Sequence, residues 1–510
     1  MPRLATSRRQ AAGCAPLPSA HTGSRYARHA PERTLLYALV EAHYPDFIAR
    51  IEAEGRSLPG YVREAFDAYL RCGVLEHGFL RVVCEHCRAE RLVAFSCKKR
   101  GFCPSCGARR MAESARHLVE EVFGPRPVRQ WVLSFPYPLR FLFASKPEAI
   151  GPVLGIVQRV IAGWLADQAG IDRASAQCGA VTLIQRFGSA LNLNIHFHML
   201  WLDGVYVEAT ELPRRELRLH RARAPTTAQL TQLAATIAHR VCRHLTRKGW
   251  LEGEGESAFL ADSAAGDDSM DGLRMSSITY RIATGRDAGR KVVTLQTLPG
   301  DAGSLEGDAG KVGGFSLHAG VAAEAHESHK LEKLCRYITR PAISEKRLSI
   351  ALQGRVRYQL KTPWRNGTTH VEWDPVDFIA KLAALVPPPR AHLTRFHGVF
   401  APNANLRAQL TPSGRGKRPA GDAAPVDVSA HDAPRSPEEK RRAMSWAQRL
   451  KRVFSIDVTA CVHCGGTVRI VASIEEPTAI RAILAHFEKH GAREEAHYRP
   501  AARAPPVQAA

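Results

Sequence analysis

Two histidines stand two residues apart in a segment whose side chains alternate in polarity. The segment reads Leu-Asn-Leu-Asn-Ile-His-Phe-His-Met-Leu-Trp-Leu over residues 191–202, with the histidines at His196 and His198. Because successive side chains of a strand point to opposite faces of a sheet, the pattern predicts a strand with one apolar face and both imidazoles on the other. Two neighbouring imidazoles can bind one divalent cation. The alternative is that both rings only occupy the solvated face of a half-buried sheet.

Cysteines form a second group with ligand spacing. Cys84-Glu-His-Cys87 and Cys103-Pro-Ser-Cys106 are two Cys-x-x-Cys segments, and residues 88–102 lie between them. Each segment can present two thiolates to one ion, so together they predict one tetrahedral structural Zn²⁺ site. Cys97, Cys72 and His77 are candidates for additional zinc ligands. The alternative for the two extra cysteines is that they are small apolar core residues.

A third Cys-x-x-Cys segment lies near the C-terminal end of the sequence, at Cys461-Val-His-Cys464. It supplies half of a zinc site, so binding would need His463 or a distant residue. The first thirty residues lack the apolar core of a secretory signal, which argues against a disulfide framework for the 12 cysteines.

Residues 324–341 predict a helix that carries a tyrosine among cations. Leu331, Leu334, Cys335 and Ile338 form its buried stripe. On a neighbouring face, helical spacing aligns four polar side chains, those of His326, Lys330, Lys333 and Tyr337. Lys330 and Lys333 could hold a phosphodiester and favour the phenolate of Tyr337 as a nucleophile. The alternative is an amphipathic tyrosine at the boundary of the core.

The overall charge indicates an anionic partner. The 510 residues contain 71 Lys and Arg against 49 Asp and Glu, a formal net charge of +22. Such an excess favours polyanions, of which nucleic acid is the commonest. The sequence has no run of about 18 apolar residues that could span a bilayer, so we expect no membrane segment.

The order of patterns predicts an α+β fold: a central antiparallel sheet flanked by helices, an N-terminal cysteine-rich zinc-binding domain and a small C-terminal Cys-x-x-Cys module. Helices are expected near residues 34–54, 59–71, 111–122, 149–168 and 225–248, and strands near 130–135, 179–187 and 191–202. The expected segments are a disordered basic arm (1–33), a helical and zinc-binding domain (34–111), a large α+β domain (112–410) with a flexible excursion at about 253–275, a linker (411–435), a basic helix with the Cys-x-x-Cys module (436–490) and a disordered tail (491–510).

Together these motifs resemble one family, the HUH single-strand transposases of rolling-circle bacterial insertion sequences. The resemblance is closest to the single-tyrosine "common region" branch and covers most of the chain. Phe95–Cys106 resembles the zinc-binding module of that family, Asn194–Leu200 its HUH motif and Leu334–Pro341 its catalytic tyrosine motif. The combination is more specific than any part, because His-x-His alone is common by chance.

The resemblance implies a mechanism and its cofactors. His196 and His198 would hold Mg²⁺ or Mn²⁺, and Tyr337 would attack a phosphodiester of single-stranded or hairpin DNA to give a 5′-phosphotyrosine adduct. The family usually needs a third metal ligand: His318 is our first candidate, with Gln185 and His326 as alternatives.

The resemblance also leaves alternatives. Two-tyrosine relatives carry a second tyrosine where this chain has Lys333, so Tyr337 is expected to act alone. The resemblance to this family also implies a nucleoid-associated enzyme of the bacterial cytoplasm. A rolling-circle replication initiator or relaxase would use the same chemistry, but the sequence has no Gly-x-x-x-x-Gly-Lys-Ser/Thr segment of a helicase. A non-catalytic zinc-dependent DNA-binding protein is the alternative from another class. The sequence does not indicate an oligomeric state.

Overall fold

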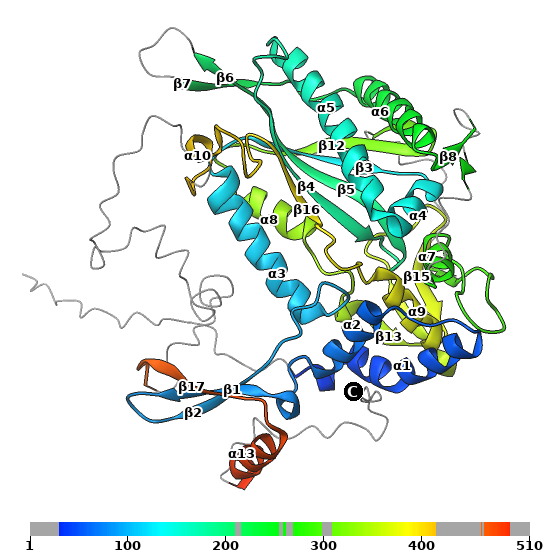
Figure 1. The fold of residues 1–510 in the computed structure, drawn as a ribbon, viewed down its shortest axis with the longest axis vertical. Coiled ribbons are helices and arrows are strands. Elements are labelled where there is room, and N and C mark those ends of the chain that lie inside the picture. Colours follow the sequence, from blue (N-terminus) through cyan, green and yellow to red (C-terminus); the bar gives the residue numbers. More distant parts are fainter. Residues whose placement is uncertain are drawn as a thin grey trace, which may run out of the picture.

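A six-stranded antiparallel sheet forms the centre of the molecule (Figure 1). The computed structural model describes residues 30–209, 216–253, 259–261, 269–297, 309–414, 461 and 464–489. Most of the predicted basic arm (1–33), nearly all of the linker (411–435), the start of the 436–490 segment, His463 and the 491–510 tail lie outside these residues.

The strand with the two histidines, β5 (Leu193–Leu202), lies inside this sheet. The strand order is β11 (Ala309–Val312), β12 (Phe315–Ala323), β3 (Val128–Ser134), β5, β4 (Gly179–Phe187) and β16 (Thr394–Gly398), and every neighbouring pair is antiparallel. The predicted strand is confirmed, although it begins at Leu193. Leu191, which has a positive φ of 54°, lies before it and packs in a different core. Because β5 has a partner on each side, its register fixes which face each histidine occupies.

The two faces of the sheet pack against different helices. Phe197, Met199 and Trp201 enter the largest core, under α4 (Tyr137–Ser145), α5 (Ile150–Ala169) and α6 (Thr227–Arg247). Leu200 and Leu202 pack on the opposite face with α3 (Pro104–His117), the π-helical segment η3 (Leu118–Phe123) and α8 (Ser328–Ile338). Figure 1 shows α5 and α6 on one side of the sheet and α3 and α8 on the other. The mixed α+β architecture with an antiparallel sheet is as predicted.

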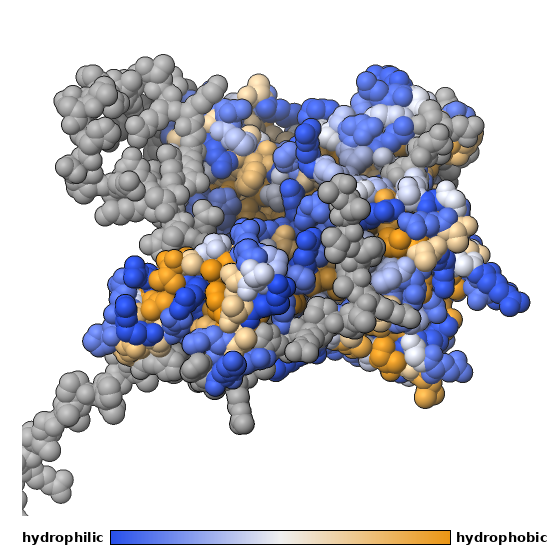
Figure 2. All heavy atoms as spheres, turned by 60° about the horizontal axis from the view of Figure 1, so that its bottom comes forward, coloured by the Kyte–Doolittle hydropathy of each residue, from blue (hydrophilic) through white to orange (hydrophobic). Residues whose placement is uncertain are grey.

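One helix has the length and hydropathy of a membrane span. It comprises Pro147–Ala169, and 67% of its apolar 18-residue stretch is buried inside the protein. That burial against the sheet is the ordinary position of a core helix in a large domain. On the face turned forward in Figure 2, hydrophobic residues form separate patches among hydrophilic ones.

A second core joins the N-terminal helices to a later part of the chain. The helices α1 (Leu35–Ala53) and α2 (Gly60–Arg71) pack with α7 (Asp271–Ile278) and α9 (Pro375–Leu385). The same core includes a four-stranded sheet of β10 (Val293–Gln296), β15 (Thr368–Trp373), β14 (Val356–Gln359) and β13 (Leu348–Ile350). This core crosses the boundary expected at residue 111. Helix α7 also begins inside the segment expected to be a flexible excursion, residues 253–275. Met270 and Leu273 of that segment are buried in this core.

A third sheet pairs the N-terminal cysteine-rich segment with the last described strand. Strand β1 (Phe79–Cys84) pairs with β2 (Glu90–Ala94) on one side and with β17 (Val468–Ile474) on the other. Helix α13 (Pro477–Lys489) covers it, with Ile480 and Leu484 packed on Phe79. The C-terminal segment is therefore part of a sheet with the N-terminal cysteine-rich segment.

The remaining elements are short. They are the strand pairs β6 (Gly204–Ala209) with β7 (Glu216–Arg221) and β8 (Leu251–Glu252) with β9 (Phe259–Leu260), the helix α10 (Arg407–Leu410), and the single turns η1 (Pro31–Arg33), η2 (Leu75–His77), η4 (Pro147–Ala149), η7 (Glu345–Arg347) and η8 (Leu352–Gly354).

A buried ion pair fixes the end of the histidine strand. Asp203 follows β5 and accepts two hydrogen bonds from Arg129 of β3, at 2.8 and 2.9 Å, with only 3% of its side chain exposed. Asp203→Ala should lower the free energy of unfolding by about 3–5 kcal/mol, because it leaves the Arg129 guanidinium buried without a carboxylate. Urea titration measures this change. The control is Asp167→Ala, which breaks a surface pair with Arg173 and should cost at most about 1 kcal/mol. Equal losses in the two variants would contradict this role of Asp203.

Candidate active site and cysteine clusters

The structure brings the two imidazoles into direct contact. The Nε2 atoms of His196 and His198 lie 3.1 Å apart, and both side chains are buried. The Nδ1 atom of His196 lies 2.9 Å from the carbonyl oxygen of Asn194, which accepts a hydrogen bond from the Nδ1–H group. That hydrogen bond leaves the lone pair of His196 Nε2 facing the second ring, where a cation can be bound.

Gln130 controls the second imidazole. Its side-chain amide lies 2.8 Å from His198 Nδ1. When the amide NH₂ donates to Nδ1, His198 carries its proton on Nε2 and donates it to His196. When the amide is turned so that its oxygen accepts from Nδ1, both Nε2 lone pairs are free for one cation. The site therefore accommodates either a proton or a metal ion between the two rings.

Burial keeps both imidazoles neutral. It lowers the pKa of His196 to about 4, and the positive charges of Arg340 and Arg140 add to this effect. Burial also lowers the pKa of His198 to about 2, helped by its neighbour His196. Neutral imidazole is the form that binds metal, so the pair is in its ligand form near pH 7.

Tyr337 lies beside these histidines. Its ring centroid is 6.2 Å from that of His198, and 39% of the residue is exposed. Tyr337 lies in the last turn of α8, three residues before Arg340. The other face of this helix packs on the sheet through Leu331 and Leu334. The helix therefore holds the partly exposed phenol beside the buried histidine pair.

The cations on Tyr337 are not those expected from the sequence. Arg340 and Lys361 each lie 4.2 Å from the centre of the ring. Lys330 instead pairs with Glu327, and neither it nor Lys333 makes a hydrogen bond or cation–π contact with Tyr337. The reason is that helical side chains lean toward the N-terminus of their helix. Lys330 and Lys333, which precede Tyr337 in α8, therefore lean away from it. Arg340 lies just after the end of α8, and its side chain reaches back over the ring. The catalytic role expected for Lys330 and Lys333 is accordingly not supported by their positions.

The first candidate for a third metal ligand is misplaced. His318 of β12 stands opposite Val132 of β3, and Val132 stands opposite His198. Two strand spacings, about 10 Å, thus separate the backbones of His318 and His198. Among the described residues, no cluster of three potential ligands unites His318 with the two histidines. His326, the other histidine considered, is exposed in the turn before α8.

Gln185 has the position that His318 lacks. It lies directly across from His196 in β4 and is 5% exposed. Its Nε2 atom donates to the carbonyl oxygen of Ile338, 3.1 Å away on the tyrosine helix, while its buried Oε1 atom has no hydrogen-bond partner in the described part of the chain. A buried amide oxygen without a partner is costly unless something binds it.

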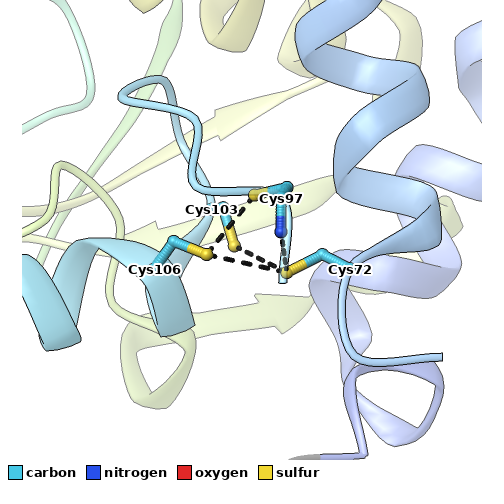
Figure 3. A group of neighbouring side chains, drawn as sticks. All are labelled: Cys72, Cys97, Cys103 and Cys106. Carbon is cyan, nitrogen blue, oxygen red and sulfur yellow. Dashed lines mark hydrogen bonds between the residues drawn. The ribbon is translucent and has the colours of Figure 1, made fainter. Parts of the chain in front are cut away.

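Four cysteines from three segments form one compact cluster (Figure 3). Cys72 ends α2, Cys97 follows β2, and Cys103 and Cys106 begin α3. The sulfur of Cys72 lies 3.8 Å from that of Cys103 and 3.7 Å from that of Cys106, while Cys97 and Cys106 are 3.4 Å apart. These separations approach the edge of a tetrahedron around zinc, about 3.8 Å for Zn–S bonds of 2.3 Å.

The grouping of the Cys-x-x-Cys segments expected from the sequence is wrong. Cys84 and Cys87 do not join Cys103 and Cys106 but form a second cluster with Cys461 and Cys464. The sulfur atoms of Cys84 and Cys464 are 3.5 Å apart, as are those of Cys87 and Cys461. The physical reason is the pairing of β1 with β17, which places the third Cys-x-x-Cys beside the first.

Other features of the second cluster favour metal binding. The backbone N–H of Cys87 donates to the sulfur of Cys84 and lowers the pKa of that thiol to about 6. Thiolate is the form that binds zinc. His77, considered as an additional ligand, lies in η2 and belongs to neither cluster. The two tetracysteine clusters fit structural zinc.

Several site residues carried no clear signal in the sequence. Gln130 and Lys361 belong to no recognisable motif, and only the strand register and the fold bring them to the site. Arg340 lies inside the segment that resembles the tyrosine motif, and its position three residues after Tyr337 is the signal that the sequence contains.

Two family models match the chain. One, described as "Putative transposase", covers residues 179–407 and so includes His196, His198 and Tyr337. The other, a transposase zinc-binding domain of the IS91 type, covers residues 39–135. That segment contains the whole first cluster and half of the second, whereas Cys461 and Cys464 lie outside both matches. No curated protein and no solved structure matches the chain significantly.

The cysteine clusters predict a zinc content. The purified protein should contain two zinc ions per chain by elemental analysis, one for each cluster. Cys97→Ser should remove one ion, and the paired change Cys84→Ser with Cys461→Ser should remove only the other. Cys178→Ser, which alters a cysteine outside both clusters, is the control and should leave both. Loss of both ions from the paired variant would favour the grouping of Cys84 with Cys103 instead.

Proposed function

Because the chain belongs to the IS91-type transposases with an N-terminal zinc-binding domain, we propose that it cuts and rejoins one DNA strand through Tyr337. The chemistry is a transesterification that needs a divalent ion, Mg²⁺ or Mn²⁺, and passes through a covalent 5′-phosphotyrosine. The expected substrate is single-stranded or hairpin DNA at the ends of a mobile element. Transposition by this route would be rolling-circle-like and would take place at the bacterial nucleoid.

One observation carries the proposal: two neutral imidazoles face each other at 3.1 Å beside an exposed tyrosine ring. A structural histidine pair in a sheet needs no such neighbour. A strand-cutting site does, because a nucleophile and an electrophilic centre must be held together before reaction.

His196 and His198 would hold the ion through their Nε2 atoms, and Gln185 would supply an oxygen ligand through Oε1. Imidazole and amide oxygen together suit Mg²⁺ or Mn²⁺ when the remaining positions are left to water and phosphate. Bound there, such an ion supplies Lewis-acid polarisation of the scissile phosphate.

The residues of this chain account for the remaining steps. The phenolic oxygen of Tyr337 forms a bond to phosphorus and loses its proton, while the bond from phosphorus to the 3′ oxygen breaks and that oxygen leaves as a hydroxyl. Arg340 and Lys361, both on the tyrosine ring, would neutralise the charge of the phosphate. Since the phosphotyrosine keeps the energy of the cleaved bond, attack by another 3′ hydroxyl releases Tyr337 and joins strands.

Covalent capture on a denaturing gel tests this function. The protein is incubated with single-stranded element ends labelled at the 5′ or the 3′ end, with Mg²⁺ or with EDTA. We expect a protein–DNA adduct that retains only the 3′ label, needs the metal and is lost in Tyr337→Phe.

The control is Tyr358→Phe, a buried tyrosine of β14, which should still form the adduct. Metal-dependent cleavage that persists in Tyr337→Phe would move the nucleophile elsewhere. Intact binding with no cleavage of the correct ends would leave a non-catalytic DNA-binding protein.

The third ligand gives a separate prediction. Gln185→Ala should weaken activation by Mn²⁺ about 10–100-fold, seen as a higher metal concentration for half-maximal cleavage, because an oxygen ligand is lost. His318→Ala removes an imidazole two strands away and is the matched control, for which we expect less than about a twofold change. The reverse order would restore His318 as the ligand.

A further inference from the structure

A cavity of about 390 Å³ lies next to the proposed active site. Its walls come from the start of α3 and the loop before it, from β4, from the end of α8 and from residues 385–394. Gln185 and Arg340 belong both to this cavity and to the active site described above. The volume falls in the range of about 300–1,000 Å³ that is typical of pockets for small ligands.

The charged side chains that line the cavity are all cationic. They are the guanidinium groups of Arg100, Arg110, Arg186 and Arg340, and none of the described residues that line the cavity is Asp or Glu. Among the described residues, Arg100 and Arg110 donate side-chain hydrogen bonds to backbone carbonyl oxygens, those of Ala391 and of Lys98 and Lys99. Arg340 donates to the carbonyl oxygen of Tyr337 and also interacts with the Tyr337 side chain, so none of the three has a carboxylate partner there. Like charges gathered in this way repel each other unless an anion joins them.

Arg186 is the most informative of the four. It is only 7% exposed, its Nε atom is buried without a partner, and its side chain makes no ion pair or hydrogen bond with any described residue. The nearby Arg274 already pairs with Asp271. Burial and this second cation lower the pKa of Arg186 to about 10. A buried guanidinium without a carboxylate lowers stability, and such groups normally bind an anion.

The first cysteine cluster holds two of these arginines in place. Arg100 lies in the loop between Cys97 and Cys103, and Arg110 lies one turn after Cys106 on α3. Arg110 donates to the carbonyl oxygens of Lys98 and Lys99, which closes the loop against the helix. The close approach of Gly107 to Pro341, where an added Cβ would lie 2.7 Å from the proline side chain, brings this frame onto the end of α8.

We propose that the cavity binds one unpaired nucleotide of the DNA strand that is cut, with its phosphate among Arg100, Arg110 and Arg186. The cavity volume admits one nucleotide out of the stack, as in enzymes that bind an extruded base. The nucleotide is adjacent to the scissile phosphate, because Arg340 and Gln185 line both sites. Zinc in the first cluster would then serve DNA recognition by fixing the arginine loop. This inference rests on the proposed function.

Binding is measured in the Tyr337→Phe background, so that cleavage does not interfere. The probe is a fluorescent single-stranded element end, followed by anisotropy over a range of salt concentrations. Arg186→Met should weaken binding about tenfold or more, because charged hydrogen bonds to the phosphate are lost. The same variant should raise the Tm of the DNA-free protein, because Met keeps the volume and removes an unpaired buried charge. If Arg186 had only a structural role, Arg186→Met would instead lower the Tm.

Arg100→Ala is compared with Lys99→Ala. The two residues are neighbours with the same charge, but Lys99 pairs with Glu64 and does not line the cavity. We expect about a fivefold loss of affinity for Arg100→Ala and less than twofold for Lys99→Ala. Equal losses, or unchanged binding in Arg186→Met, would overturn the proposal. Equally tight and equally sensitive binding of a duplex of the same sequence would also overturn it, by excluding recognition of an unpaired nucleotide.

These outcomes are separable from failure of the proposed function. The anisotropy measurement requires no reaction, so a protein that never forms the adduct can still show the predicted difference between Arg186→Met, Arg100→Ala and Lys99→Ala. Conversely, a Tyr337-dependent adduct with no such difference would keep the enzyme and remove the pocket.

Discussion

The pairing of β5 between β3 and β4 is the constraint on which the rest of the site depends. The register sets His196 opposite Gln185 and His198 opposite Val132, and so decides which side chains can meet a bound ion. A slip of one residue would send both imidazoles into the apolar core and bring Phe197 to the site. The apolar side chains of β5 therefore do more than stabilise the sheet. A slip would move these apolar side chains out of the large core and put the imidazoles in their place, which is unfavourable. The apolar side chains therefore also fix the face on which the histidines lie.

The tyrosine helix completes the site through contacts of a different kind. Helix α8 packs on the histidine face of the sheet through Leu331, Leu334 and Ile338. The hydrogen bond from Gln185 to the carbonyl oxygen of Ile338 ties this helix to the strand next to β5. The distance from Tyr337 to His198 thus depends on one apolar interface and one polar contact, both within a few residues of the nucleophile.

Local patterns in the sequence predicted the parts of the fold that local physics determines. The alternation in β5, the apolar stripe of α8 and the spacing of α1 and α6 all follow from side-chain periodicity. Periodicity cannot show which distant segments pair. For that reason spacing alone groups Cys84 and Cys87 with Cys103 and Cys106, whereas the β1–β17 pairing brings Cys461 and Cys464 beside them. The place of His318 in a strand that leads into the tyrosine helix favours it as a ligand, but β3 separates that strand from β5.

The central claim is that Tyr337 becomes covalently joined to DNA, and peptide mapping of the adduct tests it most directly. The adduct formed with Mg²⁺ is digested with a protease and a nuclease, and the peptide that carries a nucleotide is identified by fragmentation in a mass spectrometer. We predict the added nucleotide mass on Tyr337, through a bond stable to mild acid as a phosphotyrosine is. A nucleotide on any other residue, or an adduct with an unmodified Tyr337, would contradict the assignment of the nucleophile and with it the reading of the histidine pair as its partner.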